Sequence, residues 1–598
     1  MNNTKKDVYT LGINSAYHEP SVCLIKNGKV IAAVEEERFN RMKHGKHCLI
    51  DNPHELPYNA LDYCLKQGGI TLDDVDQIGF TFNPINRLTK NIGLEEDVDA
   101  GDWGSEKGER LYYKLSMSVP QILEKKYKAK IAHKWNWLPH HTCHAASAYY
   151  DSPFSEAAVM TFDGIGEFAS ITLGYGKNNN LSIFKEAGEY PSSLGFQWTK
   201  ASRFLGILVD GAGEYGAGKI MALASYGNPD KYYETFKKFL SYDKEGNFVV
   251  DGDVMQFRKS THENFEKMFG FKARKEDGEI TQDHMDFAAA LQKITNEIML
   301  GYAQQVYKLT KQDNLCMAGG VTLNCTSNTN LLEKSRFKDI YIQPGANDMG
   351  TSVGAAYYCY HEILGQERRN VAAKTPYTGP EYGEKEILKA LKNEKGVQYV
   401  KVTGIEKATA KLIAEGKVIG WVQGRAEFGP RALGNRSLLG DPRKIEMFKR
   451  ISLDIKKREW YRPLAPIVMD EYVDQWFNRP KHGAESDKWM LFAYPIRTGK
   501  RKLIPAVTHH DGTGRVQVVS RDTNSRLHKL ISHFNSLTGV PVLINTSFNS
   551  NEPMVLTPEH AINTFLKSGK DGIDVLVIGS YLITRKDIDA KKLAKHKS

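Results

Sequence analysis

The chain has 598 residues, which is more than one hydrophobic core usually organises, so we expect two large domains. Hydrophobic residues at 41% and charged residues at 25% are ordinary for a soluble protein, and no apolar run is long enough to span a membrane. The seven cysteines include no CxxC pair, and the first residues carry no secretory signal. We therefore expect a cytoplasmic protein with reduced thiols and no membrane partner.

The net charge of +10 is concentrated in one part of the chain. From Gln423 to Arg462 there are 11 Lys and Arg residues against 5 Asp and Glu residues, interleaved with glycine, proline and aromatic residues. A surface for nucleic acid would more simply present its cations along a polar face. The pattern therefore predicts a structured pocket for small anions and no nucleic-acid partner.

The first part of the chain predicts strands that end in turns. "VYTLGINS" and "SVCLIKNGKVIAAVEEERF" are strand-like, with Asn27-Gly28 as a two-residue hairpin turn. The stretch 94–110 favours a loop, and Pro139 is well placed to begin a helix. "SEAAVMTFDGIGEFASITLGYG" predicts two strands separated by a turn, and "DGAGEYGAGKIMALASYG" a glycine-rich loop that leads into a helix.

The next segments repeat the order strand, glycine turn, helix. Residues 283–308 have helical periodicity, and "NLCMAGGVTLNCTSNTNLL" and "DIYIQPGANDMGTSVGAAYYCY" each predict a strand, a turn and a helix. A polar connector occupies roughly residues 362–400, and strands such as "VIGWVQG", "VQVVS", "VPVLINTSFN" and "VLVIGSYLIT" follow it. We predict an α/β protein with domains at residues 1–374 and 375–598 and with ligands at the strand ends.

Two histidines and two aspartates suggest a metal site. His140 and His144 share one face of the predicted helix, although such a pair alone is more often structural. A zinc-protease motif would need a Glu directly after the first His, and here that residue is His141. Asp163 and Asp348 stand at strand–turn boundaries, so the four side chains could form a mixed nitrogen and oxygen site suited to Fe, Mn or Zn.

Glycine turns in the same part of the chain suggest a nucleotide. Gly319 and Gly320 in "MAGGVTLN" would let the backbone approach a phosphate or adenosine closely, before a helix N-terminus that favours anions. Lys219, in the second glycine-rich loop, could meet a phosphate. Neither stretch is a Walker or a dinucleotide motif, and a bare glycine turn is more often only a turn.

The motifs together resemble a known enzyme family. "HHTCHAASAYYDSPF", "VMTFDGIGE", "GKIMALASYG", "AGGVTLN" and "PGANDMGTSVGAA" are similar to the N-terminal domain of the ATP-dependent O-carbamoyltransferases that modify antibiotics and nodulation factors. "GRAEFGPRALGNRSLLGDPR", "KKREWYRPLAP", "HDGTGRVQVV" and "INTSFNSNEP" resemble the C-terminal domain of that family. The resemblance implies an actin-like/hexokinase-superfold domain, related to the threonylcarbamoyl-transfer ATPases, followed by a YrdC-like domain.

The resemblance also implies a two-site reaction. The C-terminal domain would hydrolyse carbamoyl phosphate to carbamate, which would attack the α-phosphate of ATP in the N-terminal domain. Carbamoyl adenylate and pyrophosphate would form, and a hydroxyl of a small natural product would take the carbamoyl group. The implied metal is iron, with Mn²⁺, Mg²⁺ and Zn²⁺ as alternatives, and a homodimer is kept open as the assembly.

The family pattern assigns roles to residues of this chain. It makes His140, His144, Asp163 and Asp348 ligands of the metal, and it makes His18 either a general base for the acceptor hydroxyl or a hairpin residue that hydrogen-bonds its own loop. The chain departs from the pattern after His18, where Glu19-Pro20 replaces the usual Asp. The remaining matches are the nucleotide-binding Lys219, Gly319, Gly320 and Asn324, and the carbamoyl phosphate-binding Arg431, Lys456, Arg462, Arg515 and Asn545, of which Arg431, Lys456 and Arg462 would also be catalytic.

Two other functions compete with small-molecule carbamoylation. A tRNA threonylcarbamoyl transferase would not need the fused basic C-terminal domain, and a nucleotide-binding scaffold or sensor without turnover would not need both the metal residues and the basic set. The acceptor is not fixed by the sequence. Acidic residues in "GLEEDVDAGDWGSEKGERLYYKL" would favour a cationic acceptor, although solvated acidic loops are common.

Overall fold

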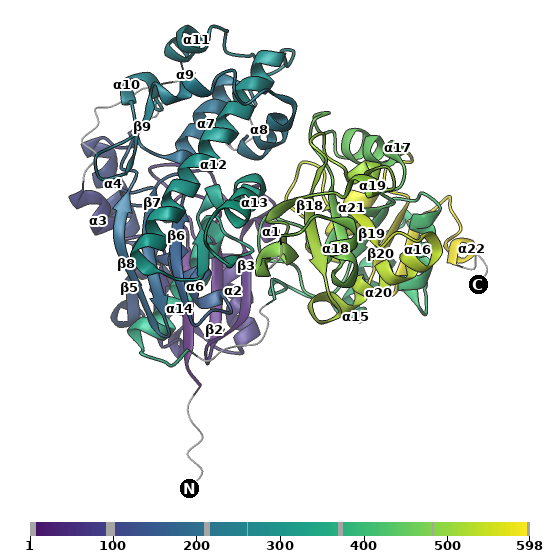
Figure 1. Ribbon diagram of the computed structural model, residues 1–598. Coiled ribbons are helices and arrows are strands. Elements are labelled where there is room, and N and C mark those ends of the chain that lie inside the picture. Colours follow the sequence, from purple (N-terminus) through teal and green to yellow (C-terminus); the bar gives the residue numbers. More distant parts are fainter. Residues whose placement is uncertain are drawn as a thin grey trace. The chain divides into compact units, whose positions relative to one another are not determined.

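The computed structural model describes residues 7–90, 102–207, 216–259, 261–368, 375–480 and 484–594. The chain forms two compact units, residues 1–374 and 375–598. Each unit combines strands and helices, as Figure 1 shows, so the predicted α/β class is confirmed.

The first sheet of the N-terminal unit has the strand order β3-β2-β1-β4-β5. Strands β1 to β3 are antiparallel neighbours, and β4 and β5 continue the sheet in parallel with β1. Asn27 and Gly28 have φ angles of +50° and +80°, so the predicted hairpin turn is confirmed. The strands are β1 (Tyr9–Asn14), β2 (Ser21–Lys26), β3 (Lys29–Glu35), β4 (Gln77–Phe80) and β5 (Trp135–Trp137).

The second sheet repeats the topology of the first. Its order is β12-β11-β6-β7-β8, with β6 to β8 antiparallel and with β11 and β12 parallel to β6. A duplicated sheet of this kind agrees with the superfold expected for the N-terminal domain. The strands are β6 (Glu156–Phe162), β7 (Ile171–Lys177), β8 (Asn180–Ala187), β11 (Asn314–Ala318) and β12 (Asp339–Ile342).

Two helices pack between the two sheets. Helix α14 (Thr351–Tyr358) packs on β1, β2 and β4, helix α6 (His140–Asp151) packs on β6 and β11, and the two helices pack on each other. A side-chain carbon on Gly354 would lie 1.8 Å from the carbonyl oxygen of Cys143, and one on Gly12 would lie 1.8 Å from that of Ser352. These two positions must be glycine because α14 approaches both α6 and β1 through backbone atoms.

The remaining elements of this unit lie around the two sheets (Figure 1). The predicted loop 94–110 is wrong at its end, because α4 begins at Glu106; residues 91–101 lie outside the described residues. Ser105 explains the early start, since its hydroxyl accepts a hydrogen bond from the N–H of Gly108 and caps the helix. These elements are α1 (Glu37–Asn40), α2 (Tyr58–Gly68), α3 (Pro84–Thr89), α4 (Glu106–Met117), α5 (Val119–Tyr127), α7 (Leu194–Phe204), α8 (Ala217–Leu223), α9 (Tyr233–Lys237), β9 (Leu240–Tyr242), β10 (Phe248–Val250), α10 (Gly252–Met255), α11 (Glu263–Phe269), α12 (Gln282–Thr310) and α13 (Cys325–Lys334).

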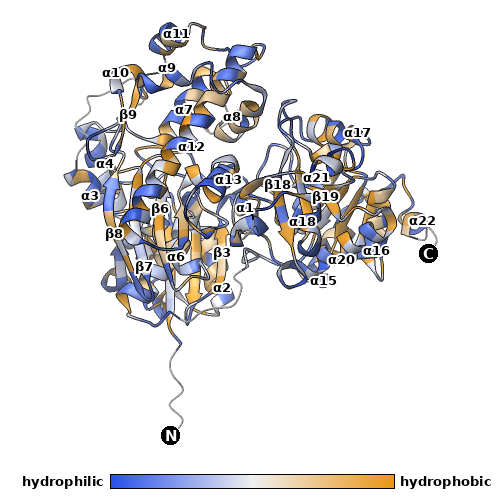
Figure 2. Cartoon of the chain, in the orientation of Figure 1, coloured by the Kyte–Doolittle hydropathy of each residue, from blue (hydrophilic) through white to orange (hydrophobic). Residues whose placement is uncertain are grey.

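The C-terminal unit contains one mixed sheet with the order β13-β21-β20-β14-β15-β19-β16-β18-β17. Every residue of β16 and β20 is buried, and Figure 2 shows how hydrophobic the strands β18 and β19 are. The predicted connector is shorter than expected, because α15 already begins at Glu384. The strands are β13 (Val397–Lys401), β14 (Ile419–Val422), β15 (Arg436–Gly440), β16 (Ala465–Met469), β17 (Phe492–Pro495), β18 (Thr513–Val519), β19 (Val542–Ser547), β20 (Val575–Ile578) and β21 (Tyr581–Arg585). The helices are α15 (Glu384–Asn393), α16 (Ile405–Ala414), α17 (Ile445–Phe448), α18 (Val473–Trp476), α19 (Thr498–Arg501), α20 (Arg521–Thr538), α21 (Pro558–Lys567) and α22 (Ala590–Ala594).

None of the seven cysteines, all of which lie in the described part of the chain, forms a disulfide bond. Among the described residues, none of the helices has the length and hydropathy needed to cross a bilayer.

A buried ion pair joins α3 to α4 and to the turn that follows β6. The guanidinium of Arg87 donates from Nε and Nη2 to the Glu109 carboxylate at 2.8 and 2.6 Å, and from Nη1 to the carbonyl of Glu167 at 2.9 Å. The two paired side chains are 5% and 0% exposed, so neither charge can be solvated if the other is removed.

We expect Arg87→Met to lower the free energy of unfolding of the N-terminal unit by about 3–5 kcal/mol, because it leaves the Glu109 carboxylate buried and unpaired. The double variant Arg87→Met/Glu109→Leu should recover a large part of this loss. Arg110→Ala is the matched control, since Arg110 forms an exposed pair with Glu106. Urea denaturation followed by circular dichroism measures all three. Equal midpoints for R87M and R110A would contradict the assignment.

Candidate functional site

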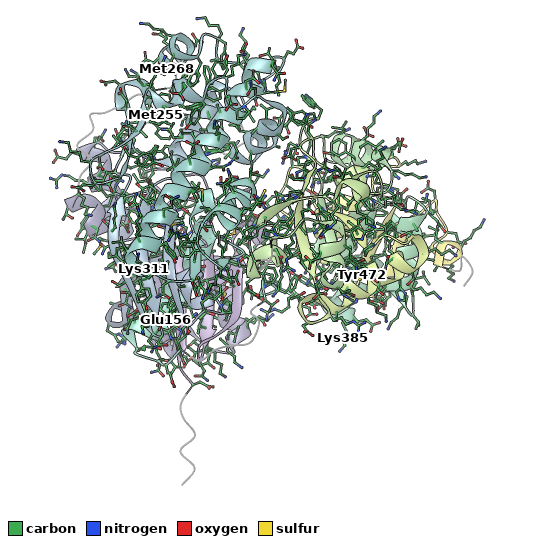
Figure 3. All side chains as sticks on the ribbon, viewed as in Figure 1. Glu156, Met255, Met268, Lys311, Lys385 and Tyr472 are labelled. Carbon is green, nitrogen blue, oxygen red and sulfur yellow. The ribbon has the colours of Figure 1, made fainter. Side chains whose placement is uncertain are left out.

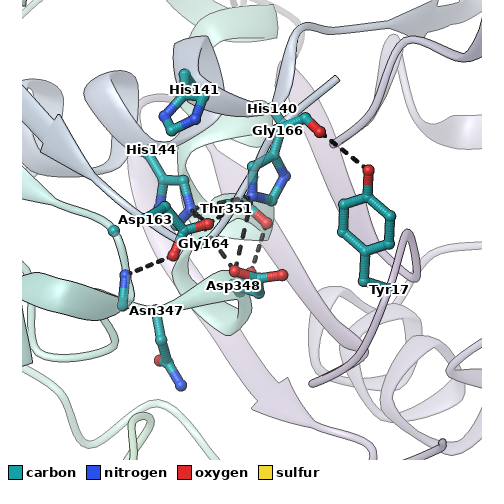
Figure 4. Close-up of polar contacts among 12 residues, drawn as sticks. Tyr17, His140, His141, His144, Asp163, Gly164, Gly166, Asn347, Asp348 and Thr351 are labelled. Carbon is teal, nitrogen blue, oxygen red and sulfur yellow. Dashed lines mark hydrogen bonds and ion pairs between the residues drawn. The ribbon is translucent and has the colours of Figure 1, made fainter. Parts of the chain in front are cut away.

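Four polar side chains meet where strands of the second sheet end. His140 and His144 lie in the first turns of α6, Asp163 follows β6, and Asp348 begins the short turn before α14. The two Nε2 atoms are 3.1 Å apart. One carboxylate oxygen of Asp163 lies 3.4 Å from the Nε2 atom of His140 and 3.5 Å from that of His144. One carboxylate oxygen of Asp348 lies 3.6 and 3.7 Å from the same two atoms. All four residues are buried, and Figure 4 shows their convergence. We call them the tetrad.

The tetrad fits a divalent metal ion. Bonds of about 2.1 Å to a common ion would place neighbouring ligand atoms about 3.0 Å apart in an octahedron and about 3.4 Å apart in a tetrahedron. The four ligand atoms all lie within 4.8 Å of one another, so small side-chain rotations would bring them onto one ion. Two imidazole nitrogens and two carboxylate oxygens suit Fe²⁺, Mn²⁺ and Zn²⁺ alike. The sequence-based ligand set is thus brought together, and its metal binding stays a prediction.

Electrostatics in the tetrad favour charged side chains despite burial. Burial opposes the imidazolium of His140, but the carboxylates of Asp348 and Asp163 outweigh it and raise the pKa of His140 well above its usual value. Burial likewise opposes the carboxylate of Asp163, and the hydrogen-bonding imidazoles of His140 and His144 hold its pKa well below its usual range. The charged forms of His140 and Asp163 are thus favoured in spite of burial, and a divalent ion bound here would replace ring protons.

His140 is held at both its backbone and its ring. Its backbone N–H donates to the two carboxylate oxygens of Glu167 at 2.9 and 3.1 Å, which places a carboxylate at the N-terminus of α6. Its Nδ1 donates to the carbonyl oxygen of Thr81 at 3.1 Å, so Nε2 is the ring nitrogen that faces the tetrad. Sequence reasoning missed Glu167, although the residue stands in the motif "DGIGE" that was singled out.

His141 has a structural role. Its Nδ1 lies 2.8 Å from the hydroxyl of Thr161, and its Nε2 lies 2.8 Å from the carbonyl oxygen of Ala169. Burial and the neighbouring imidazoles of the tetrad lower the pKa of His141 to about 3, so the ring is neutral. Both ring nitrogens of His141 already have hydrogen-bond partners, so we do not place this residue among the metal ligands.

The predicted glycine turn is part of the same site. The N–H of Gly320 donates to Oδ1 of Asp163 at 2.8 Å, which leaves Oδ2 to face the histidines. Gly319 has a φ of +99°, and a side-chain carbon there would lie 2.1 Å from the carbonyl oxygen of Phe162. Asn324 caps α13 through its side-chain oxygen, and Lys219 lies in α8, which packs on α7 and α12. Nucleotide binding by these four residues stays a prediction.

His18 reaches the edge of the tetrad, with its Nε2 3.8 Å from Oδ2 of Asp348. The adjacent Glu19 hydrogen-bonds Asn347 and lies 3.3 Å from the Nδ1 of His44. The ammonium group of Lys46, a residue that sequence reasoning missed, donates to the carbonyl oxygens of Ser15 and Asn52 at 2.7 and 2.9 Å. Burial lowers the pKa of Lys46 to about 7. The loop that carries His18 is therefore held from two sides.

A basic cluster forms the second candidate site, in the C-terminal unit. Burial and the charges of Arg462, Arg515 and Arg431 lower the pKa of Arg458 well below its usual value, while Glu459 opposes them. The guanidinium groups of Arg431, Arg462 and Arg515 and the carboxylate of Glu459 thus lie near Arg458, and all five side chains are half-buried. Such a cluster favours a bound anion. Arg458 was missed as a site residue, although it lies in the quoted motif "KKREWYRPLAP".

The loop of Arg431 is fixed by buried polar side chains. One carboxylate oxygen of Glu427 accepts the backbone N–H groups of Leu433, Asn435 and Arg436 at 2.8, 2.7 and 3.1 Å. Asn545 donates from Nδ2 to the carbonyl oxygen of Ala432 and to Oε1 of Gln517, both at 2.8 Å. Asn545 therefore supports the residue next to Arg431.

Lys456 has other partners in this structure than the predicted phosphate. Its ammonium group donates to the carbonyl oxygens of Ser547 and Asn549 at 2.8 and 2.7 Å, and it also contacts both of their side chains. Lys456 is 3% exposed, so it anchors the loop that follows β19. Its contact with an anion stays a prediction.

Comparisons with known proteins cover both units of the chain. The family model described as "Carbamoyltransferase N-terminus" matches residues 9–357, and the one described as "Carbamoyltransferase C-terminus" matches residues 410–585. The chain is 35% identical to nodulation protein NolNO of Sinorhizobium fredii over 96% of this chain and 80% of that protein. It is 37% identical to nodulation protein NolO of Bradyrhizobium diazoefficiens over 75% of this chain and 79% of that protein. A crystal structure of full-length HypF in the phosphate- and nucleotide-bound form covers 60% of this chain and 56% of that one, with 15% identity and a TM-score of 0.33.

We expect His144→Gln to lower affinity for Fe²⁺ or Mn²⁺ by at least about ten-fold, because it removes a nitrogen donor from the tetrad. His141→Gln, one turn away on the same helix, should keep the wild-type affinity. Metal content after anaerobic loading and gel filtration, measured by elemental mass spectrometry, compares the two. Equal metal retention in H144Q and H141Q would remove His144 from the ligand set.

Proposed function

We propose a function from the premise that this chain belongs to the carbamoyltransferase family, whose members are enzymes of carbamoylation. The proposal is that the chain uses carbamoyl phosphate and ATP to form carbamoyl adenylate. It then transfers the carbamoyl group to a hydroxyl of a small natural product. The observation that carries the proposal is the presence of two chemically different candidate sites, an anion site in one unit and a metal tetrad beside a glycine turn in the other.

The basic cluster suits the first half of the reaction. Carbamoyl phosphate carries a phosphate dianion, and planar guanidinium groups bind such oxygens in pairs. Arg431, Arg462 and Arg515 would bind the phosphate, and the phosphate would also stabilise the charge of Arg458, which burial and its cationic neighbours disfavour. Hydrolysis in this site would release carbamate and phosphate.

The tetrad suits the second half. A divalent metal bound there would offset the charge of the nucleotide phosphates and stabilise the departing pyrophosphate. His140, His144, Asp163 and Asp348 would hold it. The backbone of Gly319 and Gly320 would approach the nucleotide next to Asp163, to which Gly320 is already hydrogen-bonded. Lys219 and Asn324 are the further nucleotide-binding candidates.

His18 is the candidate general base for the last step. Its Nε2 lies 3.8 Å from Asp348, which would keep the ring next to the metal-bound nucleotide. Glu19 and Lys46 fix the loop around it, so the ring is positioned from outside the tetrad. In the transfer, the acceptor oxygen bonds to the carbamoyl carbon, the bond from that carbon to AMP breaks, and His18 takes the hydroxyl proton.

We expect wild-type protein with Fe²⁺ or Mn²⁺ to catalyse exchange of labelled pyrophosphate into ATP only when carbamoyl phosphate is present. Arg431→Ala should lower this exchange by about 10- to 100-fold, because it removes a charged contact to the phosphate. Binding of ATP itself should stay unchanged.

Arg450→Ala is the matched control, since Arg450 pairs with Asp574 at 2.9 Å outside the basic cluster. Mass spectrometry should detect carbamoyl adenylate in the wild type and in R450A. A protein that binds ATP but shows neither exchange nor the adenylate across all tested metals would favour a non-catalytic scaffold.

A further inference from the structure

The loop that carries His18 connects β1 to β2 and lies inside the N-terminal unit. Its residues 15–17 and 19 are buried, and only the side chain of His18 is partly exposed, at 20%. Figure 3 shows how densely side chains fill the interior of this unit. The carbonyl groups of a loop placed there need hydrogen-bond donors from other parts of the chain.

Two tyrosines fix the first half of this loop. The hydroxyl of Tyr112 donates to the carbonyl oxygen of Ala16 at 2.8 Å. The hydroxyl of Tyr17 donates to the carbonyl oxygen of Gly166 at 2.9 Å, as Figure 4 shows. The loop is therefore joined to α4 and to the turn that follows β6.

The second half of the loop is held by a single amide. Asn14, the last residue of β1, is 0% exposed. Its Nδ2 donates to the carbonyl oxygens of His18 and Glu19 at 3.1 and 2.9 Å. Both N–H bonds of the amide are therefore directed at the candidate base and at the residue after it.

The backbone at Glu19 depends on such contacts. Its φ of +53° lies in the left-handed region, which residues with a side chain seldom adopt unless the surroundings hold them there. The N–H of Glu19 donates to the carbonyl oxygen of His44 at 2.8 Å, and its own carbonyl oxygen accepts from Asn14. Asn14 thus stabilises the turn that determines where His18 lies.

The same amide connects the loop to the end of β4. Oδ1 of Asn14 accepts a hydrogen bond from the hydroxyl of Thr81 at 2.8 Å. Carbonyl oxygens can only accept, so the two carbonyl partners of Nδ2 fix the orientation of the amide and make the Thr81 hydroxyl the donor. Thr81 is 0% exposed and follows β4, which pairs with β1.

Thr81 also contacts the tetrad, through its backbone. Its carbonyl oxygen accepts from Nδ1 of His140 at 3.1 Å. The carboxylate of Glu167 secures this junction, since its Oε1 accepts the N–H groups of Asn83 and His140 at 2.7 and 2.9 Å. A continuous set of hydrogen bonds therefore runs from the tetrad through Thr81 and Asn14 to the loop between β1 and β2.

We propose that Asn14 is the positioning residue for His18. Through Thr81, Asn14 also relates the position of this ring to that of the tetrad. The inference rests on the proposed carbamoyl transfer, in which His18 takes the hydroxyl proton, and it adds the residues that set the position of this base.

The placement of Asn14 predicts which step depends on it. A general base must lie within hydrogen-bond reach of its proton, and a displacement of about 1 Å at a reacting group can lower a rate about 100-fold. The tetrad keeps all four of its side chains without Asn14. Asn14 therefore acts on the attack by the acceptor hydroxyl and not on the formation of carbamoyl adenylate.

Three substitutions in this chain of contacts and one control test the inference. Asn14→Asp keeps the shape of the side chain but turns an oxygen toward two carbonyl oxygens. Thr81→Val keeps the shape and removes the hydroxyl, whereas Thr81→Ser keeps the hydroxyl. Thr10→Val is the matched control, because Thr10 is 0% exposed and its hydroxyl donates to the carbonyl oxygen of Ala356 at 2.8 Å near the other end of β1.

Two rates are measured with ATP, carbamoyl phosphate, Fe²⁺ or Mn²⁺, and glycerol as the acceptor probe. Exchange of labelled pyrophosphate into ATP reports the formation of carbamoyl adenylate. Release of AMP reports the second step, in which the oxygen of glycerol or water bonds to the carbamoyl carbon, the bond from that carbon to AMP breaks, and the hydroxyl proton leaves.

We expect N14D to lower AMP release by about 10- to 100-fold and T81V by about five-fold, because the base is displaced from the attacking hydroxyl. Pyrophosphate exchange should stay within about two-fold of the wild type in both variants. T81S and T10V should keep both rates. A loss confined to one of two steps, and its rescue by serine, would not follow from a general structural defect.

A second measurement follows the ring of His18 directly, in case N14D folds poorly. In protein labelled with ¹³C at the histidine Cε1 position, the His18 signal is identified by its loss in His18→Gln. This signal should shift in T81V and keep its wild-type position in T10V.

The outcomes separate this inference from the function on which it rests. Absent pyrophosphate exchange in the wild type would overturn the proposed carbamoyl transfer itself. Exchange that is present in the wild type but falls in parallel with AMP release in N14D and T81V would overturn the specific effect on the second step. Unchanged AMP release in both variants, or an unchanged His18 signal in T81V, would overturn Asn14 as the positioning residue.

Discussion

The convergence of two imidazoles and two carboxylates in a buried position is the constraint on which the candidate site of the N-terminal unit depends. Isolated charges at this depth would be very unfavourable, so His140, His144, Asp163 and Asp348 are stable only together or around a cation. Their convergence requires α6 and the two aspartate turns to meet within a few ångströms. The close backbone contacts at Gly354 and Gly319 make that approach sterically feasible.

The C-terminal unit presents the opposite case, a concentration of like charges. Three further guanidinium groups disfavour the charge of Arg458 while the carboxylate of Glu459 favours it, so a bound anion would stabilise the cluster. The loop of Arg431 is nevertheless rigid, because Glu427 binds three backbone N–H groups across it. Both candidate sites are thus pre-organised by buried polar contacts.

Local patterns could identify the residues whose position follows from neighbouring sequence. We could predict the spacing of His140 and His144 on a helix and the placement of Asp163 and Asp348 after strands. Helix and strand periodicities fix which way such residues point. Glu167, Lys46 and Arg458 were not identified as site residues. Their roles depend on partners far away in the chain, such as the backbone of His140 for Glu167, and no local pattern encodes such pairs.

The sequence by itself determined the α/β class, the hairpin at Asn27-Gly28, the helix of the histidine pair and the concentration of positive charge near residue 440. These features depend on periodicity, turn chemistry and composition, which act over a few residues. Only the tertiary structure decided that the glycine turn at Gly320 binds Asp163 and that Lys456 is held by a loop. It also decided that Arg258 donates to the carbonyl oxygen of Trp103. Those results depend on which distant backbone groups remain to be hydrogen-bonded once the sheets have packed.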